Sequence, residues 1–482
     1  MVLGTMGEAR ERLGEGRTSS EALALAAFDR IAAVDEVLNA ALATARPLSM
    51  ALAGEADARL AQGERGPVLG LPFAMKDNLN WAGAPMTCGS RILEGYVSPY
   101  DATVLRRLLD AGAVPVLKAN MDEFAMGSSG EHSAFGPARN PWDTGRAPGG
   151  SSSGSAVSVA AGYTPFALGS DTGGSVRLPA GFCGVTALRP TYGVLSRYGL
   201  AALASSLDQV GPIARTAEDV AAILSVMAGR DALDSTSVDL PDQASLFPLA
   251  AADLKGVRIG LPAEYFGEGL DAGVRSALET SLEVFKAAGA ELKTISLPRT
   301  GIAIETYAVL VACEASANLN RFDGVRYGLR EPGSSLDDMI SATRDAGFGD
   351  EVKRRILLGT FCLSKGHYDA FYLKALQART LIARDFDEAF KAVDVIATPM
   401  SPCVAFPLGA RTADPLAMYL ADVYAVAAPL AGIPALAFPA GFHENLPVGM
   451  QLMGPALSDV RLLSLAHAFQ QRTGHHLRTP DL

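Results

Sequence analysis

The sequence has few of the features that mark nucleic-acid binding, metal binding or a redox-active protein. Its 41 lysines and arginines are outnumbered by 52 aspartates and glutamates, and the net charge is −11. A chain that grips nucleic acid unaided usually presents a basic face, so unaided binding is disfavoured. The five cysteines form no CxxC pair and the six histidines form no HExxH motif. We therefore expect reduced, buried thiols and no metal site.

The chain also lacks the segments that would direct it to a membrane. Residues 1–16 contain no apolar core of a signal peptide. Residues 423–442 are uncharged and long enough to cross a bilayer, but three prolines interrupt them, which favours buried strand and turn segments. We expect no membrane span and a cytoplasmic protein.

The apolar pattern predicts alternating helices and strands. Buried strands are predicted at 68–75, 113–117, 290–295 and 394–398, and helices at 19–62, 104–109, 216–227, 272–288 and 380–391. Asp101 is predicted to cap the helix before Gly112. The alternation indicates an α/β fold, with a mixed central sheet flanked by helices. We divide the chain into an N-terminal helical segment packing on the core (1–65) and an α/β domain (66–482), with 229–256 as a loop or seam.

A glycine-rich stretch, GSDTGGSVRLPAG at 169–181, has the composition of a tight turn inside a core. Consecutive small residues let several backbone N–H groups point into one space, where they can stabilise an oxyanion. We predict that Thr172, Gly173 and Gly174 form this oxyanion hole. Ser175, which follows them, is the candidate nucleophile and needs a base.

Two kinds of base are possible for such a serine. Residues 150–154, GSSSG, match the nucleophile elbow of Ser-His-Asp hydrolases, but a loop precedes them where that motif requires a strand. The other base is Lys76, which ends the apolar run LGLPFAM. Burial lowers the pKa of a lysine and allows it to take a proton. The alternative is a lysine that extends from the strand end into an ion pair with Asp77.

A second small-residue segment, PGGSSSGS at 148–155, lies between these two candidates. Taken alone it could be a linker or a phosphate cradle, although it lacks the Gly-Lys-Ser/Thr ending of a P-loop. The apolar run that follows at 156–161 predicts a buried helix, which a linker does not usually enter directly.

Lys76, Ser151 of the GGSSSGS loop and Ser175 of DTGGSVR resemble, in order and spacing, the amidase signature family. The resemblance implies that Lys76 is the base, Ser151 relays the proton and Ser175 attacks an amide. It also implies a cis peptide bond before Ser151. The family's loop usually reads GGSSGGS, so Ser153 stands where a glycine is usual, and a glycine there could serve a positive φ.

Blocks outside the triad are similar to the branch of this family that hydrolyses glutamine inside a heterotrimer acting on Glu-tRNA(Gln) or Asp-tRNA(Asn). They lie at 122–129, 133–137, 140–143, 189–199, 205–209, 321–327 and 351–355. For glutamine, the resemblance implies binding by Ser128, Tyr307, Arg355 (or the adjacent Arg354) and Asp422. It further implies two partner subunits, B and C, through which tRNA is mainly contacted. ATP and Mg²⁺ would be used on a partner, with no cofactor in this chain.

Two alternatives remain open beside this hypothesis: a free-standing amidase acting on small amides, and a catalytically inactive scaffold. The intact triad disfavours the scaffold, and the blocks outside the triad disfavour the free-standing amidase. The choice between the two tRNA substrates is not encoded in this chain.

Overall fold

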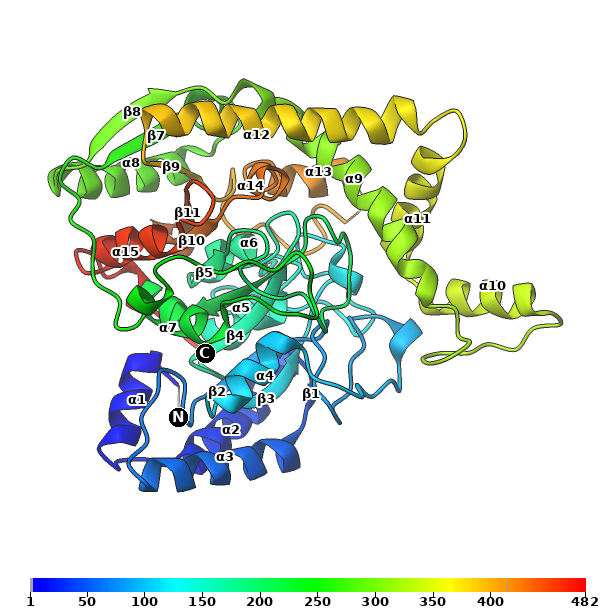
Figure 1. The fold of residues 1–482 in the computed structure, drawn as a ribbon, viewed down its shortest axis with the longest axis horizontal. Helices are drawn as coiled ribbons and strands as arrows, with labels where there is room; N and C mark the ends of the chain where they lie inside the picture. The colour runs from blue at the N-terminus through cyan, green and yellow to red at the C-terminus, as the bar shows by residue number, and fades with distance from the viewer. Residues whose placement is uncertain (1–2, 413) are drawn as a thin grey trace.

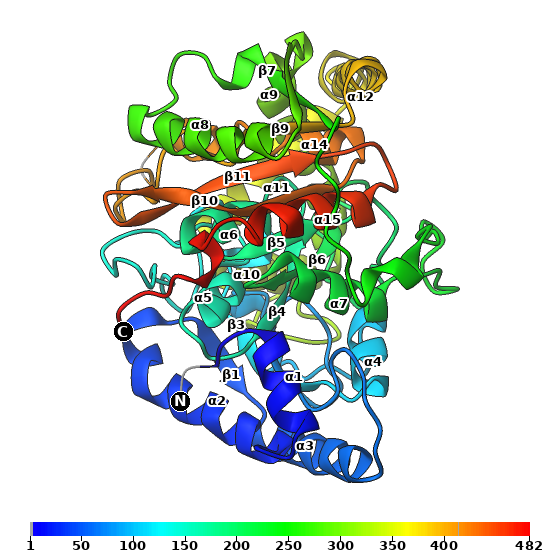
Figure 2. The same cartoon turned by 90° about the vertical axis from the view of Figure 1, so that its left-hand side faces the viewer.

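A single mixed sheet of eleven strands organises the computed structural model, which describes residues 3–412 and 414–482 (Figures 1 and 2). The strand order is β1-β3-β2-β4-β6-β5-β10-β11-β9-β7-β8. The strands are β1 (Ala41–Thr44), β2 (Pro72–Lys76), β3 (Val114–Ala119), β4 (Phe166–Asp171), β5 (Thr186–Arg189), β6 (Gln209–Ala214), β7 (Arg258–Pro262), β8 (Glu291–Ile295), β9 (Val395–Pro399), β10 (Ala435–His443) and β11 (Leu446–Met453).

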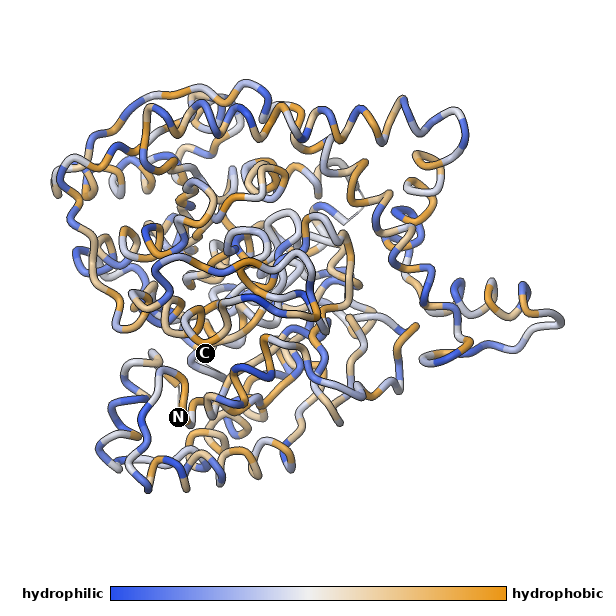
Figure 3. The backbone as a smooth tube through the Cα atoms, in the orientation of Figure 1, coloured by the Kyte–Doolittle hydropathy of each residue, from blue (hydrophilic) through white to orange (hydrophobic). Residues whose placement is uncertain are grey.

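Helices cover the sheet and confirm the predicted α/β class. They are α1 (Met6–Gly14), α2 (Ser20–Leu38), α3 (Arg46–Ala61), α4 (Thr103–Asp110), α5 (Ser153–Ala160), α6 (Arg177–Cys183), α7 (Ala217–Met227), α8 (Ala272–Ala287), α9 (Ala303–Asn318), α10 (Leu336–Gly347), α11 (Asp350–Leu363), α12 (Lys374–Ala392), α13 (Pro415–Tyr419), α14 (Ala427–Ala431) and α15 (Asp459–Gln470). On the outer helix α12, hydrophilic and hydrophobic segments alternate along the turns (Figure 3), as an amphipathic surface helix requires.

The strand pairing explains how distant residues meet. β2 runs parallel to both β3 and β4, with Met75 opposite Leu168. The carboxyl ends of parallel strands lie at one edge of a sheet, where α/β proteins commonly place their ligands. The end of β2, at Lys76, therefore lies beside the end of β4, just before the DTGGS loop.

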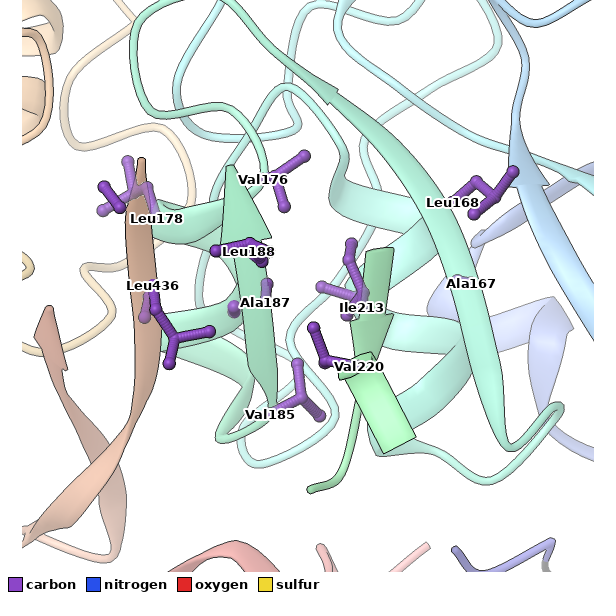
Figure 4. Packing of buried hydrophobic residues seen from close by; sticks show 14 of the residues in the cluster. Ala167, Leu168, Val176, Leu178, Val185, Ala187, Leu188, Ile213, Val220 and Leu436 are labelled. Atoms are coloured by element: carbon purple, nitrogen blue, oxygen red, sulfur yellow. The ribbon is translucent and has the colours of Figure 1, made fainter. Parts of the chain in front are cut away.

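Buried aliphatic side chains hold the middle of the sheet. Val176 and Leu178 beyond the DTGGS loop pack near Leu188 of β5, Ile213 of β6 and Leu436 of β10 (Figure 4). Each of these side chains is fully buried, and each is worth about 1.5–3 kcal/mol of burial free energy. The loop that carries Ser175 is thus anchored at its far end in a rigid core.

The first 65 residues contribute both helices and an edge strand. Ser19 caps α2 by accepting a hydrogen bond from the Ala22 N–H, and β1 pairs antiparallel with β3. The segment is consequently tied to the rest of the chain by the sheet itself. The division of the chain at residue 65 stays a prediction.

An arm of three helices, α9, α10 and α11, extends to the right of the sheet in Figure 1. α9 and α11 approach so closely that a Cβ added to Gly359 of α11 would lie 1.9 Å from the Ala312 carbonyl oxygen of α9. Only a glycine permits this contact, so the two helices pack as one unit.

Several local predictions are confirmed and one is wrong. Thr216 caps α7 through the Asp219 N–H, and residues 229–256 are a loop that contains one short 3₁₀ turn. Asp101, however, does not cap α4, because the cap position is Ala102. The Asp101 carboxylate instead accepts the Ala82 N–H and pairs with Arg106, and these contacts take the place of a cap.

Residues 423–442 form α14 and most of β10, as the prolines indicated. By length and composition alone, one helical run of the described residues, Pro298–Arg321, could cross a membrane, and half of its apolar window is buried inside the fold. The five cysteines are free thiols, four of them buried.

Candidate active site

Lys76 ends β2 inside the core, with no exposed surface. Its Nζ lies 2.7 Å from Ser151 Oγ, 3.0 Å from Ser170 Oγ and 3.2 Å from the Ser170 carbonyl oxygen. Burial lowers the pKa of Lys76 to about 7, against the opposing pull of Asp122 and other nearby carboxylates. The amine is therefore available as a base near neutral pH, and the strand-end ion pair with Asp77 is not what holds it.

Ser151 lies where the Gly/Ser loop meets α5. The Gly150–Ser151 peptide bond is cis, as the resemblance implies. A Cβ on Gly150 would lie 1.9 Å from Asp122 Oδ2, so a glycine is required there. Ser153 forms the first residue of α5 in a helical conformation rather than at a positive φ, and its Oγ donates to the Asn120 carbonyl at 3.3 Å. The departure from the family's loop is thus accommodated.

Ser175 lies on the adjoining loop, and its carbonyl accepts the Ser152 N–H at 3.0 Å. This backbone contact fastens the nucleophile loop to the loop that carries Ser151. The structure thus brings Lys76, Ser151 and Ser175 to one buried place from three separate stretches of sequence. The final step of the relay, from Ser151 to Ser175, stays a prediction.

Asp171 sets the shape of the nucleophile loop. Its carboxylate accepts the N–H groups of Gly174 at 3.0 Å and Val176 at 3.2 Å, and it is bracketed by Arg177 and Arg189. All three charged side chains are fully buried. Burial raises the pKa of Asp171, but the two arginines outweigh it and lower that pKa to about 2. The loop is therefore built on a permanently ionised carboxylate.

The oxyanion hole predicted at Thr172, Gly173 and Gly174 has one member with a partner of its own. The Gly174 N–H is the one that donates to Asp171, which fixes the turn. Thr172 is held by its side chain, because its Oγ1 donates to Asp208 at 2.7 Å. The N–H groups of Thr172 and Gly173 stay the predicted donors to a substrate oxygen.

Asp422 and Ser128 meet across the nucleophile loop. Ser128 Oγ donates to Asp422 Oδ2, whereas Asp422 Oδ1 is buried and has no hydrogen-bond partner among the described residues. That free oxygen faces the loop, because a Cβ on Gly174 would lie 3.3 Å from it. Burial raises the pKa of Asp422 to about 7. A buried carboxylate with an unpaired oxygen is suited to bind a cationic group.

Tyr307 of α9 closes over the same loop. A Cβ on Gly173 would lie 2.6 Å from the Tyr307 hydroxyl oxygen, so the phenol sits directly against the predicted oxyanion donors. Burial raises the pKa of Tyr307, which keeps the hydroxyl protonated and able to donate.

Arg355, rather than its neighbour Arg354, is turned toward the site. The Arg355 side chain is 7% exposed, whereas that of Arg354 is 50% exposed. Arg355 Nε donates to Glu351 Oε1 at 2.8 Å, and its guanidinium lies over the Tyr419 ring, 5.2 Å from the centroid. One edge of the guanidinium is thereby fixed by Glu351, and its planar fork has the geometry that binds a carboxylate.

Sequence reasoning missed two groups at the base and in the binding site. Ser170, which touches Lys76 Nζ, also contacts Asn78 Nδ2 at 2.9 Å. Neither residue type stands out in an apolar strand or a strand-end turn, and only the β2–β4 pairing reveals the contact. Glu351 was also missed, although its spacing of four residues before Arg355 on a helix is a readable signal.

Comparison with known proteins assigns the family to which these features point. Residues 22–463 match the family model described as Amidase, so this chain belongs to the amidase family. It is 52% identical over 479 residues to a glutamyl-tRNA(Gln) amidotransferase subunit of Carboxydothermus hydrogenoformans, with 98% of each chain covered. The subunit of the same name from Methylococcus capsulatus is 51% identical over 479 residues, covering 99% of this chain and 98% of the relative.

Solved structures give the same fold. The crystal structure of the glutamyl-tRNA(Gln) amidotransferase subunit of this name from Thermotoga maritima has a TM-score of 0.78 at 37% identity, covering 99% of this chain and 96% of that one. Native peptide amidase from Stenotrophomonas maltophilia has a TM-score of 0.83 at 34% identity, covering 97% of this chain and 96% of that one. The resemblance read from the sequence is confirmed at the level of the family and of these relatives.

Proposed function

We propose that this chain is the glutamine-hydrolysing subunit of a tRNA-dependent amidotransferase. The observation that carries the proposal is the meeting of two sets of groups at one loop: the Lys76–Ser151 contact for amide hydrolysis, and the unpartnered Asp422 oxygen facing the nucleophile loop. The relatives of matching length bear the name of such a subunit.

Hydrolysis begins when neutral Lys76 takes the Ser151 hydroxyl proton and Ser151 takes that of Ser175. Ser175 Oγ then attacks the side-chain amide carbon of glutamine, and the oxyanion accepts the N–H groups of Thr172 and Gly173. The same relay returns the proton to the leaving nitrogen, which departs as ammonia. Water cleaves the resulting acyl ester and releases glutamate.

Glutamine would be oriented by its amino-acid end. Asp422 Oδ1 accepts the α-ammonium, Arg355 binds the α-carboxylate, and the hydroxyls of Ser128 and Tyr307 complete the site. Each charged contact on the substrate is matched by a buried group of opposite sign, which favours a free amino acid over a simple amide.

The partners and cofactors belong to the same proposal. Two further subunits, B and C, would complete a cytoplasmic heterotrimer, contact most of the tRNA, and use ATP with Mg²⁺ to activate Glu-tRNA(Gln) or Asp-tRNA(Asn). The chain's net charge of −11 fits a subunit that leaves RNA binding to others.

The test separates ammonia production from amidation. Ser175→Ala in the reconstituted complex should abolish product formation with glutamine but keep it with ammonium salt and ATP, because free ammonia bypasses the acyl-enzyme. The assay is formation of Gln-tRNA or Asn-tRNA with each nitrogen donor. Ser158→Ala is the matched control, since Ser158 Oγ donates within α5 to the Gly154 carbonyl at 2.6 Å; it should use both donors.

Two outcomes would contradict the proposal. Loss of both activities in a properly assembled Ser175→Ala complex would sink the division of labour between subunits. A wild-type chain that hydrolyses unrelated small amides rapidly but supports no amidation would instead be a free-standing amidase, the second candidate that the likeness to peptide amidase favours.

A further inference from the structure

A second buried lysine lies directly behind the base. Lys118 of β3 is 1% exposed and stands opposite Met75 in the parallel pairing with β2, so it is one register position from Lys76. Its Nζ lies 3.3 Å from Asp77 Oδ1 and 2.6 Å from the Leu79 carbonyl oxygen. Nothing in the hydrolysis of an amide uses this lysine directly.

Asp77, the residue that follows Lys76, is equally buried. Its Oδ2 accepts the Thr87 N–H at 2.8 Å and the Thr87 hydroxyl at 2.5 Å, and its Oδ1 faces the Lys118 ammonium. A carboxylate taken out of water is stable only when it is paired and hydrogen-bonded. Asp77 and Lys118 therefore cancel one another's charge within the core.

This cancellation matters because Lys76 must be neutral to act as a base. An unbalanced negative charge close to an amine favours the ammonium form. We propose that Lys118 is a positioning residue for catalysis: it neutralises Asp77, so that the nearest neighbour of Lys76 in the chain places no net charge beside the base. The proposal rests on the proposed function, in which Lys76 is the base.

Four other titratable groups face Lys76 from the surrounding elements: Asp122, Asp171, Asp208 and Cys88. Asp171 is paired with two arginines, and the Cys88 thiol is neutral because burial raises its pKa well above the ordinary value. Asp122 accepts the N–H groups of Gly130 and His132, and Asp208 accepts the Thr172 hydroxyl. These groups are unchanged by a substitution at Lys118, which isolates the contribution of Asp77.

The experiment is the pH dependence of kcat/KM for glutamine hydrolysis by the assembled complex. Lys118→Met should move the acidic limb of the profile upward by roughly one pH unit, which is about a tenfold loss at pH 7 that recovers at alkaline pH. The double variant Asp77→Asn/Lys118→Met removes both charges and should return the limb to its wild-type position. Arg258→Met, which breaks a strand-borne ion pair with Asp394 near the opposite end of the sheet, should leave the limb unmoved.

An acidic limb that stays in place in folded Lys118→Met would overturn the proposal, as would a double variant whose limb moves. If Lys118→Met does not fold, the double variant and Lys118→Arg, which keeps the cation, must both show the wild-type limb. A merely structural role would lower activity equally at every pH. A wild-type complex without glutaminase activity would contradict the proposed function rather than this inference.

Discussion

At the scale of single residues, the site combines ionisable groups whose pKa values are moved in opposite directions. Burial lowers the pKa of Lys76 and raises that of Asp422, and both reach about 7. Asp171, equally buried, is held near 2 by two arginines. Burial alone therefore does not decide protonation; the presence or absence of a counter-ion does.

The pKa of Lys76 predicts the pH dependence of hydrolysis. Below about pH 7 the amine is protonated and cannot accept a proton, so kcat/KM should fall as the pH decreases through that value. Lys76→Ala should lower the rate by about 10²–10⁴ at neutral pH and remain folded, since it removes a buried ionisable group. Stopped glutaminase assays across the pH range, with circular dichroism of the variant, check both statements. Near-normal activity of the folded variant would show that Lys76 is not the base.

Asp422 should affect recognition more than chemistry. Asp422→Asn removes the charge expected to meet the α-ammonium and should raise KM for glutamine by about 10- to 100-fold, the worth of one charge-assisted hydrogen bond. Hydrolysis of a simple activated amide without an α-ammonium should change little. Asp459→Asn is the control, because Asp459 is also buried but binds Thr191. Equal losses on both substrates would assign Asp422 a structural role.

At the scale of elements, substrate recognition depends on how two helices meet. Tyr307 comes from α9 and Arg355 from α11, and the helices touch where Gly359 faces the Ala312 carbonyl. Gly359→Ala should force the helices apart, cost about 1–3 kcal/mol of stability, and raise KM for glutamine more than it lowers kcat. Gly301→Ala is the control, because a Cβ there meets no atom within 4 Å. Unchanged KM in Gly359→Ala would show that helix spacing does not position Arg355.

The elements also show how far sequence reasoning reaches. Lys76, Ser151 and Ser175 can be found because a lysine after an apolar strand and serines beside glycines are unusual local patterns. Ser170 was missed because its role exists only through β2–β4 pairing, across 94 residues of sequence. Asp101 was assigned to a cap because it precedes an apolar helix, but Arg106 and the Ala82 N–H compete for its carboxylate. Local signals predict elements, whereas contacts between distant segments decide which polar groups serve the site.

At the scale of the whole molecule, charge limits what the chain does alone. With a net charge of −11, the isolated chain should bind tRNA no more tightly than about 10⁻⁶ M at physiological salt, the range of weak non-specific binding. The assembled heterotrimer should bind more tightly, and its affinity should fall steeply with salt. Fluorescence anisotropy with labelled tRNA checks both. Tight binding by the isolated chain would place an RNA surface on this subunit.

The division of the site between two stretches of sequence has a consequence for how such proteins diversify. The bond-breaking groups come from residues 76–175 at the centre of the sheet, whereas most groups facing the amino-acid end come from residues 307–422, on the helical arm and the segment around α13. Mutations can accumulate in the second stretch without disturbing the first. Selection can therefore retarget the catalyst while inheriting its chemistry intact, and a peptide amidase that shares this fold at 34% identity is one outcome to be expected of such a history.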